Sequence, residues 1–196
     1  LRCEYVFNVK GDKFGNVHYE TFKKTNFLPH LSLLTKWEML SGAKNILTTM
    51  KFSKFDPTKN VILESKPVFY PSILTAAAKQ KVQLVKSSSQ WLDIKATTNK
   101  NSILLVTDAY AKGWKVFSYP DSSQQQYDVM PADYILRGIP LSPGTHHFRL
   151  EYAPDAFYRG RNISIAALSA YLLAWCVLLG LTLRRKIMRN EVKEEL

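Results

Sequence analysis

The sequence predicts a mainly β protein: an antiparallel β-sandwich-like extracytoplasmic domain with a short helix, followed by one C-terminal transmembrane helix. Two observations lead to this prediction. Apolar and polar residues alternate in several short segments that are separated by turn-forming residues. Residues 163–183 form one uncharged run near the C-terminus. We therefore expect three parts: an outer domain over 1–162, a membrane span over 163–183 and a cytoplasmic tail over 184–196.

The strands of the outer domain are predicted from alternation and from the turns that bound them. Segments 82–85, 91–96, 103–106, 114–117 and 146–152 have strand character, and residues 87–89, 97–101 and 142–145 have turn character. Short strands at this spacing are typical of a sandwich. Alternation in the last strand predicts that His146 lies at the edge of the core and that His147 is solvated. Pro143–Gly144 suits a type II turn.

The N-terminal part is predicted to contain both strands and a short helix. Segments 5–9 and 17–19 have strand character around a turn at Gly11–Asp12. Ser41 can cap a short helix that extends to Met50, and a further strand covers 61–63. Residues 65–81 are interpreted as a connection without assigned structure.

The uncharged run has the length of a membrane span. Its residues rise about 1.5 Å each and cover about 31 Å, close to the roughly 30 Å of a hydrocarbon core. The alternative, a buried core helix, is disfavoured because such helices rarely extend this far without a charge. Arg184, Arg185, Lys186 and Arg189 follow the run, which places the C-terminus in the cytoplasm and residues 1–162 outside the cell membrane. The lipid bilayer is then one partner of the chain.

A row of small residues lies within the span. Ala166, Ala170 and Ala174 recur at every fourth position, and such a face lets a second helix approach closely. The sequence therefore predicts that the span packs in a helix bundle.

Charge and cysteine content exclude some classes of protein. The formal net charge is +11, but the lysines are scattered without interleaved aromatic residues, so we expect no nucleic acid partner. A solvated surface, contact with anionic headgroups and attraction of an anionic lipid-linked substrate stay open. Cys3 and Cys176 form no zinc-binding spacing, and Cys176 lies inside the apolar run, which disfavours a disulfide.

No catalytic motif is present. The nucleophile elbow, the P-loop, the dinucleotide fingerprint and the HExxH motif are all absent. His146 and His147 are adjacent and would point to opposite faces of a strand, so they cannot chelate one ion. Asp108 could pair with Asp128 or Asp133 as acid and base, but the spacing fixes no distance. We predict no catalytic, cofactor-binding or metal-binding residue in this chain.

One set of residues is specific enough to suggest a family. The segment from Leu104 to Val106 leads into Asp108-x-Tyr110-x-x-Gly113-Trp114, followed by Arg137, by Pro143-Gly144-x-His146, and by Tyr152-x-Pro154 before the span. This set resembles the C-terminal end of the YfhO family of bacterial polytopic membrane proteins, in which the Pro, Gly and His belong to a hairpin. Two positions depart from the family pattern: Lys112 stands where Pro is usual, and Asp121–Ser122 replaces an Asp-Gly turn before the glutamine-rich stretch 124–126.

The resemblance implies a membrane glycosyltransferase of the C-type architecture. Such an enzyme takes sugar from a polyprenyl-phosphate donor and modifies a cell-envelope polymer or lipid, with its catalytic carboxylate in an early outer loop that is not in this sequence. The first residue is Leu1 and not Met, so we expect a fragment whose partner is an upstream transmembrane bundle of the same protein. An envelope glycan or anionic polymer is a further expected partner.

The resemblance also assigns a structural role to the motif. Trp114 would fill the core and Gly113 would permit the turn. The residues expected to define the fold are Asp108, Tyr110, Gly113, Trp114, Arg137, Pro143, Gly144, His146, Tyr152 and Pro154. The alternative function is a single-pass, surface-anchored β-sandwich that binds glycan or a partner protein without catalysis. Many hydrophobic spans upstream would favour the transferase, and a signal peptide would favour the anchored module.

Overall fold

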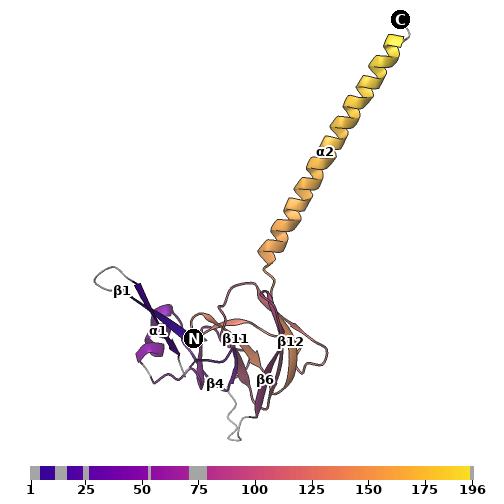
Figure 1. The fold of residues 1–196 in the computed structure, drawn as a ribbon. Coiled ribbons are helices and arrows are strands. Elements are labelled where there is room, and N and C mark those ends of the chain that lie inside the picture. Colours follow the sequence, from indigo (N-terminus) through magenta and orange to yellow (C-terminus); the bar gives the residue numbers. More distant parts are fainter. Residues whose placement is uncertain (1–4, 12–16, 24–26, 53, 71–78, 195–196) are drawn as a thin grey trace. The chain divides into compact units, whose positions relative to one another are not determined.

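The computed structural model describes residues 5–11, 17–23, 27–52, 54–70 and 79–194, with side chains up to Arg185. The chain divides into two compact units, Leu1–Tyr152 and Ala153–Leu196. The first contains all the described strands and the second is one long apolar helix, α2 (Asp155–Glu194) (Figure 1). The predicted fold class, mainly β with one C-terminal apolar helix, is confirmed.

The larger sheet of the first unit has six strands in the order β3-β8-β11-β10-β5-β4. All its neighbouring pairs are antiparallel except β4 with β5, which are parallel. The bounds are β3 (Leu31–Leu34), β4 (Lys36–Met39), β5 (Asn60–Leu63), β8 (Ser102–Val106), β10 (Met130–Ala132) and β11 (Leu136–Leu141).

A second sheet has four antiparallel strands in the order β6-β7-β12-β9. They are β6 (Gln80–Ser87), β7 (Trp91–Thr98), β9 (Trp114–Ser118) and β12 (Gly144–Tyr152). The register places Phe148 opposite Ile94 on one side and opposite Ser118 on the other. Each of these strands contains or nearly matches a segment predicted from alternation.

The main hydrophobic core lies between the two sheets. It joins alternate residues of β7 and β12 to residues of β8 and β11 in one cluster: Leu92, Ile94, Ala96, Leu104, Val106, Ile139, Leu141, Phe148 and Leu150. Burial of one such large apolar side chain contributes about 1.5–3 kcal/mol to folding. The two sheets therefore form the expected sandwich.

A second core lies on the opposite face of the six-stranded sheet. Its members include Leu34, Val61, Leu63, Ile103 and Leu105. The sheet curls, because β4 at one edge contacts β8 near the other edge. The helix α1 (Ala43–Phe52) has one fully buried side chain, that of Ile46. The sequence did not predict this second core.

The N-terminal hairpin pairs β1 (Tyr5–Gly11) with β2 (Val17–Lys23) in a separate two-stranded sheet. Val9 lies opposite Tyr19, and both side chains are exposed. The two strands were predicted, but Gly11, which was predicted to lie in the turn, is the last residue of β1. Asp12, the second residue of the predicted turn, lies outside the described residues, as do Cys3 and residues 71–78 of the predicted connection.

Two expectations about local structure are wrong, and four strands were missed. The Pro143–Gly144 segment is no hairpin, because the preceding strand β11 belongs to the six-stranded sheet and the following strand β12 to the four-stranded one. The N-cap of the helix is Gly42 and not Ser41, since the helix begins at Ala43 and the carbonyl oxygen of Gly42 accepts the first helical hydrogen bond, from the N–H of Ile46 (3.2 Å). The strands β3, β4, β10 and β11 were not predicted.

The long apolar helix begins before the uncharged run. The segment Asp155–Arg185 is long and apolar enough to cross a membrane, and it contains an 18-residue window with a mean hydropathy of 2.1, of which no part is buried. Ser169 and Thr182 donate their hydroxyl protons to the carbonyl oxygens of Ile165 (2.9 Å) and Leu179 (2.8 Å). The two hydroxyls therefore have hydrogen-bond acceptors within the helix itself, which suits an apolar environment.

Asp133 is a buried carboxylic acid between β10 and β11. Its N–H donates to the carbonyl oxygen of Ile62, and its Oδ1 accepts from the N–H of Ile62, both at 2.8 Å. Its Oδ2 is buried without a hydrogen-bond partner among the described residues. Burial raises the pKa of Asp133 to about 6.

We predict that Asp133→Asn stabilises the chain at pH 7. The raised pKa means that the folded form of the wild type binds the proton more tightly, so its stability falls as pH rises from about 4 to 6. The amide keeps the contact with Ile62 and removes the buried charge, with an expected gain of about 1–3 kcal/mol at pH 7. Urea unfolding of the full chain in detergent micelles at pH 4 and pH 7 measures this, with the exposed Asp128→Asn as control. If the free energy of unfolding changed between pH 4 and pH 7 by the same amount in Asp133→Asn as in the wild type, the prediction would be contradicted.

Candidate functional site

Several motif residues converge on the side chain of Arg137, near the start of β11. The Arg137 side chain is only 7% exposed. Its Nε donates to the carbonyl oxygen of Ala109 (2.9 Å), and its Nη1 lies 3.9 Å from Oδ2 of Asp108. Nη1 is buried without a hydrogen-bond partner among the described residues. Burial lowers the pKa of Arg137, and the carboxylate of Asp108 opposes that shift.

The indole ring of Trp114 forms one wall of this cluster. The guanidinium carbon of Arg137 lies 3.6 Å from the ring centroid, a cation–π contact. The ring of Tyr152 packs against Trp114 with centroids 5.4 Å apart, across the β9–β12 pair in which the two residues are partners. Trp114 is half-buried and packs against the main core. The expectation that it fills the core is therefore incomplete, because one face of its ring holds a cation.

Asp108 connects the cluster to the N-terminal side of the sheet. Its Oδ2 lies 2.9 Å from Nε2 of His30, which precedes β3. The backbone supports this contact, because the N–H of Thr107 donates to the carbonyl oxygen of His30 (3.0 Å). The side chains of Asp108 and His30 are 31% and 21% exposed. Sequence analysis did not identify His30 as a partner of Asp108, because the two residues are 78 positions apart in the sequence.

This group, which we call the Arg137 cluster (His30, Asp108, Trp114, Arg137 and Tyr152), joins five parts of the sandwich, of which β12 contributes Tyr152. Asp108 lies between His30 and Arg137, and Arg137 lies between Asp108 and Trp114. The polar groups thus hold the chain before β3, the β8–β9 loop, β9 and β11 in one arrangement. This is a positioning arrangement, in which a carboxylate and a cation restrain each other.

A second set of polar contacts surrounds His146. Its Nε2 lies 2.8 Å from the carbonyl oxygen of Ser142, and its Nδ1 lies 2.8 Å from the hydroxyl of Tyr127. That hydroxyl contacts Oγ of Ser122 (2.5 Å), which accepts from the N–H of His147 (3.2 Å). A carbonyl can only accept, so Nε2 carries the proton and Tyr127 donates to Nδ1. Burial lowers the pKa of His146, which favours this neutral form.

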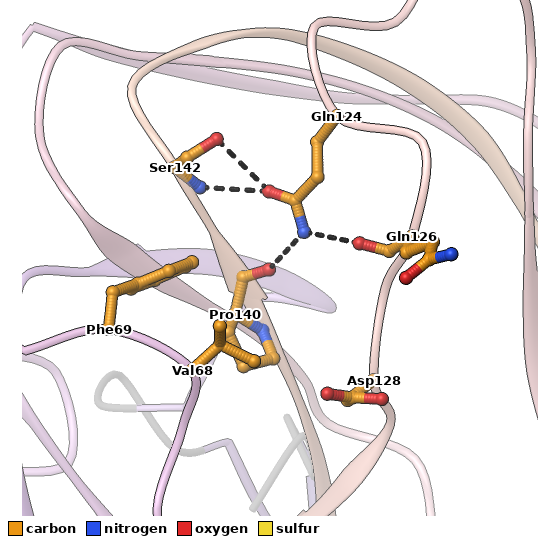
Figure 2. A pocket seen from close by; sticks show the side chains of 7 residues that line it. All are labelled: Val68, Phe69, Gln124, Gln126, Asp128, Pro140 and Ser142. Atoms are coloured by element: carbon orange, nitrogen blue, oxygen red, sulfur yellow. Dashed lines mark hydrogen bonds between the residues drawn. The ribbon is translucent and has the colours of Figure 1, made fainter.

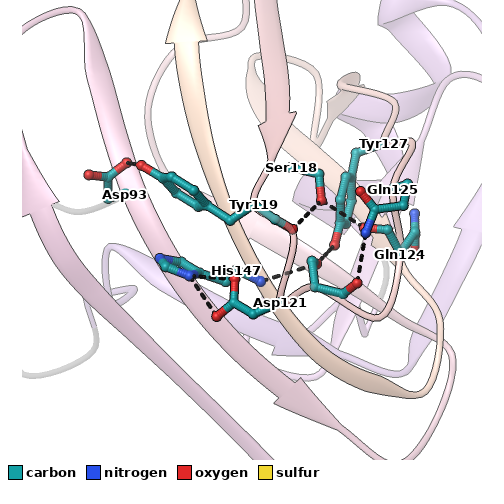
Figure 3. Close-up of polar contacts among 9 residues, drawn as sticks. Asp93, Ser118, Tyr119, Asp121, Gln124, Gln125, Tyr127 and His147 are labelled. Atoms are coloured by element: carbon teal, nitrogen blue, oxygen red, sulfur yellow. Dashed lines mark hydrogen bonds and ion pairs between the residues drawn. The ribbon is translucent and has the colours of Figure 1, made fainter.

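His146 is completely buried, and not at the core edge as expected. The expectation that His147 is solvated is also wrong. Its side chain is 20% exposed, and its Nδ1 lies 3.0 Å from both carboxylate oxygens of Asp121. Figure 3 shows that contact beside the ring of Tyr119, whose centroid lies 4.2 Å from that of His147.

Asp93 and Arg149 form an ion pair on the outer face of the smaller sheet. Nε and Nη2 of Arg149 donate to the two oxygens of Asp93 at 2.9 and 3.2 Å, and the hydroxyl of Tyr119 donates to Oδ1 (3.1 Å). The hydrogen bond from Arg149 holds the pKa of Asp93 below its usual value. The guanidinium also lies over the ring of Trp91, 4.4 Å from its centroid.

The other motif residues form backbone hydrogen bonds or adopt backbone conformations that favour glycine. The N–H of Tyr110 donates to the carbonyl oxygen of Ile135 (2.7 Å), and that of Phe157 donates to the carbonyl oxygen of Pro154 (3.1 Å). Gly113 has a φ of 119° and Gly144 a φ of 145°, both in the region that favours glycine. A Cβ on Gly144 would lie 2.6 Å from Oγ of Ser123.

Pro143 is exposed. Ala166, Ala170 and Ala174 lie on α2, where their packing against another helix stays a prediction. Of the carboxylates considered as partners for Asp108, Asp133 contacts Ile62 and Asp128 lines a separate pocket. Among the described residues, no group of three or more His, Cys, Asp or Glu side chains is placed to hold a metal ion.

We predict a measurable coupling between Trp114 and Arg137. A double-mutant cycle with Trp114→Leu and Arg137→Met isolates the cation–π contact, because the hydrogen bond from Arg137 to Ala109 is removed both with and without Trp114 and cancels. A partly desolvated contact of this kind should give a coupling free energy of about 1–2 kcal/mol. Urea unfolding of the full chain measures it. Additive effects of the two substitutions would show that the contact does not stabilise the fold.

Comparison with known proteins gives one match. No curated protein and no solved structure matches the chain. The sequence model of a family described as "Bacterial membrane protein YfhO" matches residues 47–164, which is more than half of the chain. The matched region begins inside α1 and ends inside α2. It contains the whole four-stranded sheet, β5, β8, β10 and β11 of the six-stranded sheet, and every motif residue from Asp108 to Pro154, but not β3 or β4.

Proposed function

Because this chain belongs to the YfhO family of bacterial membrane proteins, we propose that it is the C-terminal outer domain and last membrane helix of a membrane glycosyltransferase. The parent enzyme would take sugar from a polyprenyl-phosphate donor and modify a cell-envelope polymer or lipid. This segment would be non-catalytic and would position the acceptor or the donor headgroup. The single observation that carries the proposal is the family match, which covers most strands of the sandwich together with the start of the apolar helix.

The positional role is supported by the connection between the two units. The Arg137 cluster includes Tyr152, the last residue of the first unit, and α2 begins at Asp155. Ala153 in between is buried. In the sequence, only Ala153 and Pro154 separate β12 from α2, so the sandwich and the apolar helix are joined by a connector of two residues. Residues 1–162 contain 22 Lys or Arg and 13 Asp or Glu, and this formal charge of +9 would attract anionic headgroups or an anionic polymer, an effect that salt weakens.

The proposed orientation places the sandwich outside the cytoplasm and residues 184–196 inside, because four basic residues follow the span. Protease added to intact cells, after permeabilisation of any outer membrane, should digest the sandwich and spare a tag fused after Leu196. Digestion of the tag with protection of the sandwich would reverse the orientation.

We predict that removing the sandwich from the parent protein abolishes sugar transfer, and that residues 1–196 alone transfer no sugar. The assay is transfer from a polyprenyl-phosphate sugar in proteoliposomes. Arg137→Ala in the parent should lower transfer through disruption of the cluster, whereas Phe52→Ala, whose ring is 74% exposed, should leave it unchanged. Transfer by the isolated segment would refute the non-catalytic role. Full transfer by a folded parent without the sandwich would refute the positional role.

A further inference from the structure

A pocket of about 350 Å³ lies beside the end of β11, apart from the Arg137 cluster. Its volume falls at the lower end of the range of small-molecule sites, about 300–1,000 Å³. Val68 and Phe69 lie on one side of it, Gln126 and Asp128 on the other, and Pro140 between them (Figure 2). Residues from three separate segments thus form its walls.

Gln124 fixes one wall of the pocket. Its Oε1 accepts from the N–H and the hydroxyl of Ser142, both at 3.1 Å. Its Nε2 donates to the carbonyl oxygens of Gln126 (2.7 Å) and Pro140 (3.4 Å). The amide is therefore fully engaged, and it holds the loop with Gln126 and Asp128 against β11 before any ligand arrives.

The opposite wall is apolar and is also held in place. Pro67 is buried, and Nδ2 of Asn101 donates to the carbonyl oxygen of Tyr70 (2.9 Å). Between these two points, Phe69 is half-buried and Val68 is 77% exposed. A ring and a branched side chain thus face the pocket from a segment anchored at both ends.

Asp128 is the charged residue among the described residues that line the pocket, and none of these described residues is a cation. Among the described residues, its carboxylate has no hydrogen bond or ion pair, and the side-chain amide of Gln126 has none either. A phosphate or another anion would be repelled by this carboxylate. A purely apolar ligand would remove it from water without a partner, which is unfavourable. The lining therefore favours a neutral ligand with hydroxyl donors and one apolar face.

We propose that this pocket binds one ring of a neutral sugar. The apolar face of the ring would pack on Phe69 and Pro140, and its hydroxyl groups would donate to the carboxylate of Asp128 and contact the amide of Gln126. A carboxylate that accepts hydroxyl protons forms short, charge-assisted hydrogen bonds. The inference goes beyond the proposed function, because binding at this pocket requires no transfer reaction.

The test is binding of methyl glycosides of glucose, galactose and N-acetylglucosamine to the full chain in detergent micelles, followed by saturation-transfer NMR. At least one of them should bind with a Kd in the millimolar range, as the small contact area of a single ring allows. Phe69→Ala and Asp128→Ala should each weaken binding about tenfold, because each removes one of the groups that hold the ring. Phe52→Ala removes an exposed ring elsewhere and is the matched control.

Three outcomes would overturn the proposal: no binding of any glycoside, binding that both pocket substitutions leave unchanged, or displacement of the glycoside by inorganic pyrophosphate. Asp128 is exposed and makes no contact that the fold needs, so Asp128→Ala stays decisive even if Phe69→Ala unfolds. Failure here would leave the deletion assay for sugar transfer unaffected, because that assay concerns the whole sandwich.

Discussion

Two strands, β8 and β11, carry both hydrophobic cores of the sandwich. Leu104 and Val106 of β8 face the smaller sheet, while Ile103 and Leu105 enter the interior of the curled sheet. Every residue of β8 and β11 is buried. The pairing of β8 with β11 sets the geometry of the Arg137 cluster. Its register places Arg137 opposite Val106, and Asp108 follows Val106 by two residues. A substitution that shifted the two strands by one position would exchange the two faces and separate the ion pair.

The strands of the smaller sheet could be predicted because each has one buried and one exposed face. In β12, burial alternates along the strand, and the sequence alternates with it. The strand β11 gives no such signal, since it is buried on both faces and contains Gly138 and Pro140. Both residues normally disfavour a strand. Glycine suits position 138 because a Cβ there would lie only 3.2–3.3 Å from Ala132, Ile103 and Leu63.

The candidate site could be predicted only in part. The motif residues Asp108, Trp114 and Arg137 were found through a resemblance, and the structure brings them together. His30 carries no local signal, because its contact with Asp108 depends on β3 lying beside β8. The same limit applies to Trp114: alternation indicates a strand, but it does not reveal that a guanidinium occupies one face of the ring.

The side chain of Gln124 has a consequence for the solubility of the sandwich. β10 pairs with β11 only as far as Gly138, so the rest of β11 has a sheet neighbour on one side alone. An open backbone edge is a template for a strand of another molecule. Here Pro140 has no N–H to offer, its carbonyl oxygen accepts from Gln124, and the N–H of Ser142 donates to the same amide. The side chain of Gln124 thus occupies the backbone groups of Pro140 and Ser142 that a neighbouring strand would otherwise bind. An incoming chain finds no free hydrogen-bonding group at these positions, which protects the sheet from edge-to-edge aggregation.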